Sequence, residues 1–182
     1  MSSINMELPL PNDRVLAGMV ALHDYWKRLP EGHPRKSLDP VELGPALLPH
    51  VTVGHILDGG NIMRYDLISS RLQLVAPRLY PGALSTDPLE LEGTSYDLIH
   101  DILTTTAKTQ SPSALHVQFN SLEQVHRQVF LLLLPLDLRP GAPCCEDLII
   151  GLWDLSPKER LLHERRDDLT GFFLDHVSRL TD

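Results

Sequence analysis

The chain has 182 residues, of which 42% are hydrophobic and 22% are charged. This composition is too apolar for a disordered protein and can form one substantial core, so we expect a single domain. The formal net charge of -8 disfavours a nucleic-acid partner, because nucleic-acid binding depends on clustered lysine and arginine side chains, which are scattered here apart from residues 160–166.

Neither a membrane span nor a secretory signal is expected. The first residues, MSSINMELPLPND, have no basic region followed by a continuous apolar run. The longest apolar stretch, VFLLLLPL at residues 129–136, is far shorter than the roughly 20 residues that cross a bilayer. Cys144 and Cys145 are expected to be free thiols, because a bridge between neighbours is strained. We therefore expect a cytoplasmic protein that has no membrane contact.

The first predicted element is an amphipathic helix over residues 13–29, which follows a flexible N-terminus at residues 1–12. Apolar side chains recur along it at steps of three and four, at Val15, Met19, Leu22 and Trp26. Further apolar side chains widen this set into a second surface, at Leu16, Ala17, Val20 and Ala21. Because large apolar patches are uncommon on monomers, we expect this helix to form a homodimer or a partner contact. The alternative is that it wraps its own domain.

A second, short helix is predicted to begin after a loop. Asp39 can cap this helix, Pro40 suits its first position, and Glu42 stands three residues after the cap, as in a capping box. These residues therefore have structural roles and are not candidates for catalysis.

The aromatic and charged residues before this helix also have structural interpretations. Trp26 belongs to the apolar stripe and is expected in the core, while Tyr25 can reach a polar partner. An ion pair between Arg35 and Asp24 would be exposed, and exposed pairs contribute only about 0–1 kcal/mol. We do not expect a reactive site here.

Two β-rich runs at residues 51–57 and 62–69 predict an antiparallel hairpin. The D-G-G-N loop between them, at residues 58–61, has the chemistry of a tight turn. Residues 72–91 contain three prolines and predict short helical turns with irregular backbone. Residues 94–108 then predict a longer helix, because their apolar side chains recur at helical spacing.

Three further strands are predicted at residues 114–119, 127–138 and 147–154. The second of these is apolar on both faces, which predicts a central strand that is covered on each side. A closing helix is predicted over residues 157–180. Sequential strands without crossover helices imply an α+β fold with one five-stranded antiparallel sheet.

The sequence contains no recognisable catalytic or metal-binding motif. No two of the nine histidines have the i, i+3 or i+4 spacing of a helical ligand pair. There is also no G-x-S-x-G nucleophile turn and no G-x-x-x-x-G-K phosphate loop. We therefore expect a protein that is not an enzyme, with no catalytic residue and no metal site. Haem ligation by His100 stays open, and the cofactor is unknown.

Several runs of the sequence resemble a bacterial family of PAS-like domains that is common in alphaproteobacteria. In that family an aromatic D-Y-W helix is followed by P-x-R-x-x-x-D-P and by a leucine-rich L-L-P-H segment. The matching runs here are DYWKRL at residues 24–29, HPRKSLDPVEL at 33–43, ALLPHV at 46–51, MRYDLIS at 63–69 and LLPLDL at 133–138. The likeness covers about residues 22–155, and its specific part lies at the start of that span.

The resemblance implies a PAS-like domain over residues 13–155, and the C-terminal helix, which its apolar pattern predicts and which takes up residues 156–182, is expected to lie outside this domain. The resemblance also implies a five-stranded antiparallel sheet with helices on one face, flanked by the N- and C-terminal helices. Any ligand is then expected between the sheet and the helix at 94–108, where four polar-tipped side chains can orient it, namely Tyr65, Tyr96, His100 and Trp153. The middle of the domain departs from the family, since APRLYPGAL at 76–84 replaces G-x-D-L-T-G.

The leading functional hypothesis is a non-enzymatic PAS-like sensory or protein-interaction module that signals through contacts with an unknown protein partner. One alternative is a small-molecule enzyme with an unrecognised active site. Another is a purely structural dimerisation unit whose pocket is filled by its own side chains. The sequence identifies no ligand.

Overall fold

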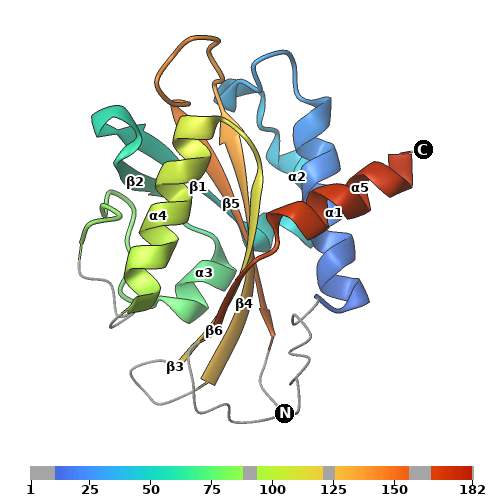
Figure 1. Ribbon diagram of the computed structural model, residues 1–182, viewed down its shortest axis with the longest axis vertical. Helices are drawn as coiled ribbons and strands as arrows, with labels where there is room; N and C mark the ends of the chain where they lie inside the picture. The colour runs from blue at the N-terminus through green and yellow to red at the C-terminus, as the bar shows by residue number, and fades with distance from the viewer. Residues whose placement is uncertain (1–10, 88–93, 121–125, 156–164, 182) are drawn as a thin grey trace, which may run out of the picture.

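A computed structural model describes residues 11–87, 94–120, 126–155 and 165–181 of the chain. It has an α+β fold in which one antiparallel sheet has helices on both faces, with the strand order β2-β1-β5-β4-β3-β6 (Figure 1). The strands are β1 (Val51–Leu57), β2 (Ile62–Leu67), β3 (Ser113–Asn120), β4 (His126–Leu136), β5 (Asp147–Leu155) and β6 (Arg165–Asp168). The helices are α1 (Asp13–Arg28), α2 (Pro40–Leu47), α3 (Ser70–Val75), α4 (Thr94–Thr109) and α5 (Thr170–Thr181), with short 3-10 turns η1 (Arg35–Ser37), η2 (Leu48–His50) and η3 (Asp58–Gly60).

The five predicted strands all form, and they belong to one antiparallel sheet. The prediction that β4 is central is also confirmed, because it pairs with β3 on one side and β5 on the other. Its side chains alternate between two cores. Phe130, Leu132 and Leu134 belong to the first, and the second takes Val129, Leu131 and Leu133.

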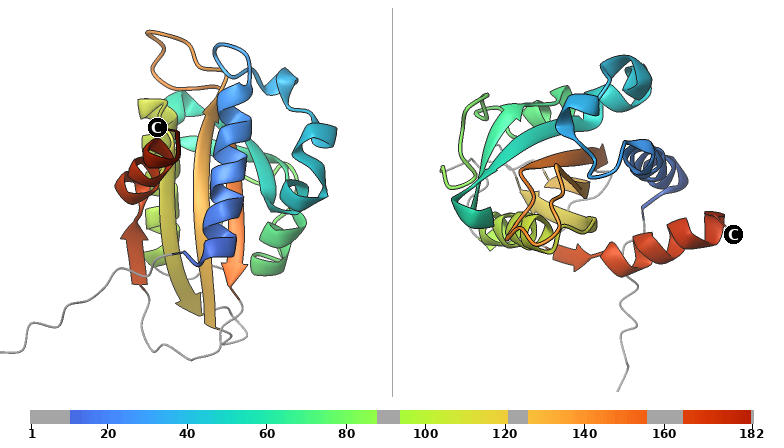
Figure 2. Two further views of the ribbon diagram at one scale, coloured as in Figure 1. Left: turned by 90° about the vertical axis from the view of Figure 1, so that its right-hand side faces the viewer. Right: turned by 90° about the horizontal axis from the view of Figure 1, so that it is seen from above.

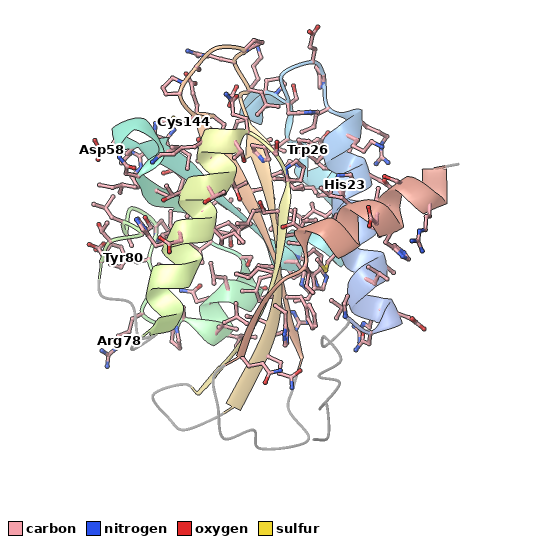
Figure 3. The ribbon with its side chains drawn as sticks, in the orientation of Figure 1. His23, Trp26, Asp58, Arg78, Tyr80 and Cys144 are labelled. Atoms are coloured by element: carbon pink, nitrogen blue, oxygen red, sulfur yellow. The ribbon has the colours of Figure 1, made fainter. Side chains whose placement is uncertain are left out.

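The two cores lie on opposite faces of the sheet. The first is formed with α1, α2 and α5, and the second with α3 and α4. Figure 2 shows α1 lying along one face of the strands, with α5 beside it. In Figure 3, His23 and Trp26 mark the α1 side, whereas Arg78 and Tyr80 lie on the side of α4. The prediction of helices on one face, apart from the flanking helices, was wrong, because α2 packs with α1 and α5 on the face opposite α4.

The C-terminal segment differs from the prediction of one helix over residues 157–180. β6 pairs with β3 as a sixth strand, and α5 begins only at Thr170. Phe173 of α5 then packs edge-on against His23 of α1, with ring centroids 5.4 Å apart. The helix prediction was wrong for residues 165–168 because R-R-D-D has no alternating apolar pattern, and an edge strand can be held by backbone hydrogen bonds alone.

Hydrogen bonds of Trp26, Tyr25 and Asp39 hold the start of the domain in place, and those of Tyr25 and Asp39 match the roles that the sequence predicts for them. The Nε1–H of Trp26 donates to the carbonyl of Pro135 on β4 at 2.7 Å, which ties α1 to the central strand. The hydroxyl of Tyr25 accepts from the backbone N–H of Asp39 at 2.8 Å. Asp39 in turn caps α2, since its carboxylate accepts from the N–H of Val41.

The β1–β2 hairpin forms where the D-G-G-N loop was expected. Asp58, Gly59 and Gly60 have φ angles of 49°, 62° and 96°. Three successive left-handed residues are tolerated here because two of them are glycines, which lack the Cβ that disfavours this conformation. The turn thus sets the register in which β2 pairs with β1.

The second apolar surface that was expected on α1 is largely used within the chain. Leu16 and Val20 are half-buried and pack against the core around α1. Among the described residues, the large hydrophobic side chains that are exposed lie on other elements, at Val41, Leu48, Leu67, Leu74 and Tyr80. Ala17 and Ala21 of that surface stay exposed, so self-association through α1 remains a prediction with a smaller apolar surface than expected.

Candidate functional site

Among the described residues, the space predicted as a pocket between the sheet and α4 holds core side chains and a shallow hollow. Tyr65 is buried there in the core beside α3 and α4. His100 is half-buried on α4 and borders a shallow hollow next to Met63 and Ser85, whose accessible volume is about 0 Å³. Typical ligand pockets span about 300–1,000 Å³, so this hollow is too small for a ligand of ordinary size.

The other two residues predicted for this pocket do not join it in the described structure. Trp153 lies on the opposite face of the sheet, in the core around α1, so its assignment to the α4 pocket was wrong. The reason is that β5 is apolar on both faces: Leu148, Ile150 and Leu152 face α4, while Ile149 and Trp153 face α1. Tyr96 lies in the first turns of α4, and its side chain is outside the described residues.

A larger groove, of about 820 Å³, lies on the face where Trp153 is found. It runs between α1 and the segment formed by α2 and η2, and β5 closes its floor. The groove exists because the facing side chains are small, at Ala17, Gly18 and Ala21 on α1 and at Pro45 and Ala46 on α2. Ala17, Ala21 and Ala46 are solvent-exposed, so the groove is open to a ligand from outside.

Trp153 forms the aromatic floor of this groove. Its indole lies directly against the backbone of α1, since a Cβ at Gly18 would stand 2.5 Å from its Nε1. Gly151 confines the other edge, because a Cβ there would stand 2.8 Å from Cη2 of the same ring. The two glycines therefore hold the indole in one orientation, and its side chain is only 6% exposed.

His50, the last residue of η2, stacks on this indole. The ring centroids are 5.2 Å apart and the planes differ by 16°. Nδ1 of His50 donates to the carbonyl of Leu152 at 2.7 Å, and because a carbonyl can only accept, the neutral ring keeps Nε2 as an acceptor. Burial lowers the pKa of His50, the Leu152 hydrogen bond opposes that shift, and the charges of Arg71 and Arg14 lower the pKa further. The imidazole is therefore neutral at physiological pH.

Three charged side chains also line the groove, namely Arg14, Arg71 and Asp154. Arg14 is placed by the first turn of α1, where the Asn12 side chain accepts from the N–H of Val15. Arg71 is placed by the first turn of α3, which is capped by Ser69. The buried Ser69 is itself anchored to β1, because its N–H donates to the hydroxyl of Thr52.

A separate ionic cluster joins the N-terminal loop to three strands. Arg35 on η1 donates to Asp66 of β2 at 2.7 Å and to Asp147 of β5 at 2.9 Å. His55 of β1 also contacts Asp147 at 3.0 Å, and Arg64 donates to Asp66 at 2.7 Å. The pair of Arg35 with Asp24 that the sequence suggested is replaced by these longer-range contacts.

The carboxylates of this ionic cluster have opposite pKa shifts. Burial raises the pKa of Asp147, and the hydrogen bonds from His55 and Arg35 oppose that shift. The hydrogen bond from Arg64 is the main cause that lowers the pKa of Asp66, with a further contribution from Arg35. Because both carboxylates are occupied by cationic donors, we interpret the cluster as a clamp that holds η1 on the sheet.

The described residues offer little support for a metal-binding site or a reactive thiol. Among them, no group of three or more histidine, cysteine, aspartate or glutamate side chains could hold a metal ion. Cys144 and Cys145 are free thiols, as predicted. Burial raises the pKa of Cys145 to about 12, which keeps this thiol protonated and unreactive.

No helix in the described ranges is long and apolar enough to cross a membrane. No family model matches the chain, and neither a curated protein nor a solved structure matches it. The function of the groove therefore has to be inferred from the residues that line it. Ala17 and Ala21, which line the groove, belong to the surface of α1 for which the sequence predicts a dimer contact.

Proposed function

We propose that the chain is a non-enzymatic PAS-like sensory module that binds a small molecule in the groove between α1 and α2 and signals through protein contacts. The observation that carries this proposal is the groove itself. Its volume of about 820 Å³ is in the usual range for ligand pockets. Its lining combines an apolar floor with a few polar groups that can orient a bound molecule.

The PAS-like part of the proposal rests on two supports. One is the resemblance of the N-terminal runs, which include Tyr25, Trp26, Arg35 and Asp39. The other is the antiparallel sheet, in which β1 to β5 supply the five strands that the resemblance implies. Each of those four side chains makes a contact that joins the N-terminal region together or to the sheet. A shared scaffold does not by itself define a function, so the groove carries the functional part.

The proposal assigns binding to the groove because of the groups that line it. A neutral imidazole stacked on an indole and two guanidinium groups can hold a molecule by stacking and by hydrogen bonds. A signal can leave through α1, because this helix lines the groove with Ala17 and Ala21 and also packs against α5 through His23. Movement of α1 on binding would therefore alter a surface far from the ligand.

The test is to fill the groove with a larger side chain and to measure which small molecule the protein retains through purification. Ala21→Phe places an aromatic ring in the groove from an exposed helix position. Thr105→Phe is the matched control, since Thr105 is an exposed position on α4, outside the groove. Both proteins would be purified under native conditions, and small molecules released by denaturation would be identified by mass spectrometry.

We expect the intact chain and the Thr105→Phe variant to release the same compound, and the Ala21→Phe variant to release none. Any compound found would then be added back and should raise the Tm of the first two proteins only. Equal retention by all three proteins would place the ligand elsewhere. If the intact chain releases no compound and no member of a panel of metabolites raises its Tm, the proposed function is wrong.

A further inference from the structure

Two arginine side chains border the groove without an ion-pair partner among the described residues. Within the described residues, Arg14 and Arg71 make no salt bridge and no side-chain hydrogen bond. Arg35, Arg64 and Arg139 each pair with a carboxylate. The exposed Arg28 and Arg179, like Arg14 and Arg71, make no salt bridge in the part of the chain that the structure describes. What distinguishes Arg14 and Arg71 is that both line the same groove.

Both guanidinium groups line the groove close enough to His50 for their charges to act on it. They do so although they come from helices that are far apart in the sequence. The other charged group that lines the groove is Asp154. Two positive charges and one negative charge leave a formal excess of one positive charge, which suits a singly charged anion.

We propose that the groove binds an amphipathic carboxylate, whose charged group lies between Arg14 and Arg71 and whose apolar body lies on Trp153. The inference rests on the proposed function and adds the class of ligand to it. A guanidinium group matches a carboxylate because its planar N–H donors can form two parallel hydrogen bonds. Apart from the two arginines, Asn12, His50 and Asp154, the rest of the lining is apolar or small, and this favours a hydrocarbon or aromatic body; it includes Val15, Leu43, Leu47 and the alanines of α1 and α2.

Binding of such an anion also has a consequence for His50. The guanidinium charges now disfavour protonation of this imidazole. The other charged side chain that lines the groove is Asp154. A bound carboxylate would offset the guanidinium charges and favour the imidazolium, whose Nδ1 already donates to the carbonyl of Leu152. The carboxylate should therefore raise the pKa of His50, whereas an uncharged ligand of the same shape should not.

Isothermal titration calorimetry of the full chain with matched probes tests the inference. The probes are octanoate and 3-phenylpropanoate, their uncharged primary amides, and acetate, which has the charged group without an apolar body. The protein variants are Arg14→Gln and Arg71→Gln, with Arg28→Gln as control, because Arg28 is exposed on α1 but does not line the groove. All three arginines are exposed, so the variants should fold.

We expect at least one of the two larger carboxylates to bind, and its amide and acetate to bind roughly tenfold or more weakly. Arg14→Gln and Arg71→Gln should each weaken carboxylate binding about tenfold and leave amide binding unchanged, while Arg28→Gln should change neither. NMR titration should show a raised His50 pKa in the carboxylate complex only.

The possible failures are distinguishable. If amides bind as tightly as carboxylates and Ala21→Phe abolishes both, the groove is a binding site but the carboxylate inference is wrong. If carboxylates bind but Arg28→Gln weakens them as much as the groove variants do, the attraction is non-specific and the inference is also wrong. If no probe binds, the carboxylate inference fails, and the mass spectrometry described above decides the proposed function independently.

Discussion

Replacing Gly18 with alanine places a methyl group where the indole of Trp153 lies. The new Cβ would stand 2.5 Å from Nε1 and 3.0 Å from Cε2 of that ring, whereas non-bonded heavy atoms normally approach to about 3.5–4.0 Å. The indole has no space to retreat into, because Gly151 confines its far edge and His50 stacks on its face. The substitution must therefore displace either the ring or α1.

A matched control separates the packing cost of Gly18→Ala from the gain in helix propensity that any Gly→Ala substitution brings. Overpacking a core costs about 1–3 kcal/mol, while a helical glycine replaced by alanine gains up to about 1 kcal/mol of helix propensity. Gly171→Ala in α5 should show the gain alone, because a Cβ there meets no atom within 4 Å. The unfolding free energy of the Gly18→Ala variant should thus lie about 1–3 kcal/mol below that of the Gly171→Ala variant.

Urea denaturation followed by far-ultraviolet circular dichroism measures both variants without relying on tryptophan fluorescence. A second arm combines Gly18→Ala with Trp153→Phe, which removes the atoms that clash. In the Trp153→Phe protein, Gly18→Ala should lower the unfolding free energy much less than it does in the wild-type protein. The double-mutant cycle should therefore show strong coupling between the two positions. Equal stability of the two alanine variants, or additive effects of the Gly18 and Trp153 substitutions, would refute the packing described for the groove floor.

Three further outcomes are expected. The lowered pKa of Asp66 means that its ionised form stabilises the fold above about pH 4 and that this contribution disappears as the pH falls. Asp66→Asn should therefore lower the unfolding free energy by about 1 kcal/mol at neutral pH and hardly at all in acid, and an equal loss at both would contradict this. A thiol reagent at neutral pH should modify Cys144 before Cys145, as mass spectrometry of the native protein would show, and equal rates would contradict the burial of Cys145. The homodimer predicted through α1 is tested by light scattering across a concentration series, and a monomer throughout would contradict it.

Most of the sheet could be predicted because its strands are bounded by local turn chemistry. The D-G-G-N loop located the hairpin, and the apolar run of β4 indicated a strand that is covered on both faces. The capping residue Asp39 located the start of α2 for the same reason, since a cap is a contact between residues close in sequence. These features required no knowledge of distant parts of the chain.

The groove could not be predicted, because it depends on three segments that meet only in the folded chain. Ala17 and Ala21 lie on α1, Ala46 on α2 and Trp153 on β5. The face on which Trp153 lies was undetermined, since both faces of β5 are apolar. Arg35 presents the same difficulty, because its partner Asp147 is 112 residues away and no local pattern connects them.

The sixth strand determines where this chain can be shortened. A fragment that ends at residue 155 would keep all five strands that the sequence predicts. It would nevertheless leave the backbone groups of β3 that pair with β6 open to solvent, and it would remove Phe173 and Val177 from the core around α1. Open strand edges promote pairing between molecules. A fragment intended for crystallisation or for fusion should therefore extend through α5, because association of a shorter fragment would report a newly exposed edge and not the assembly of the intact chain.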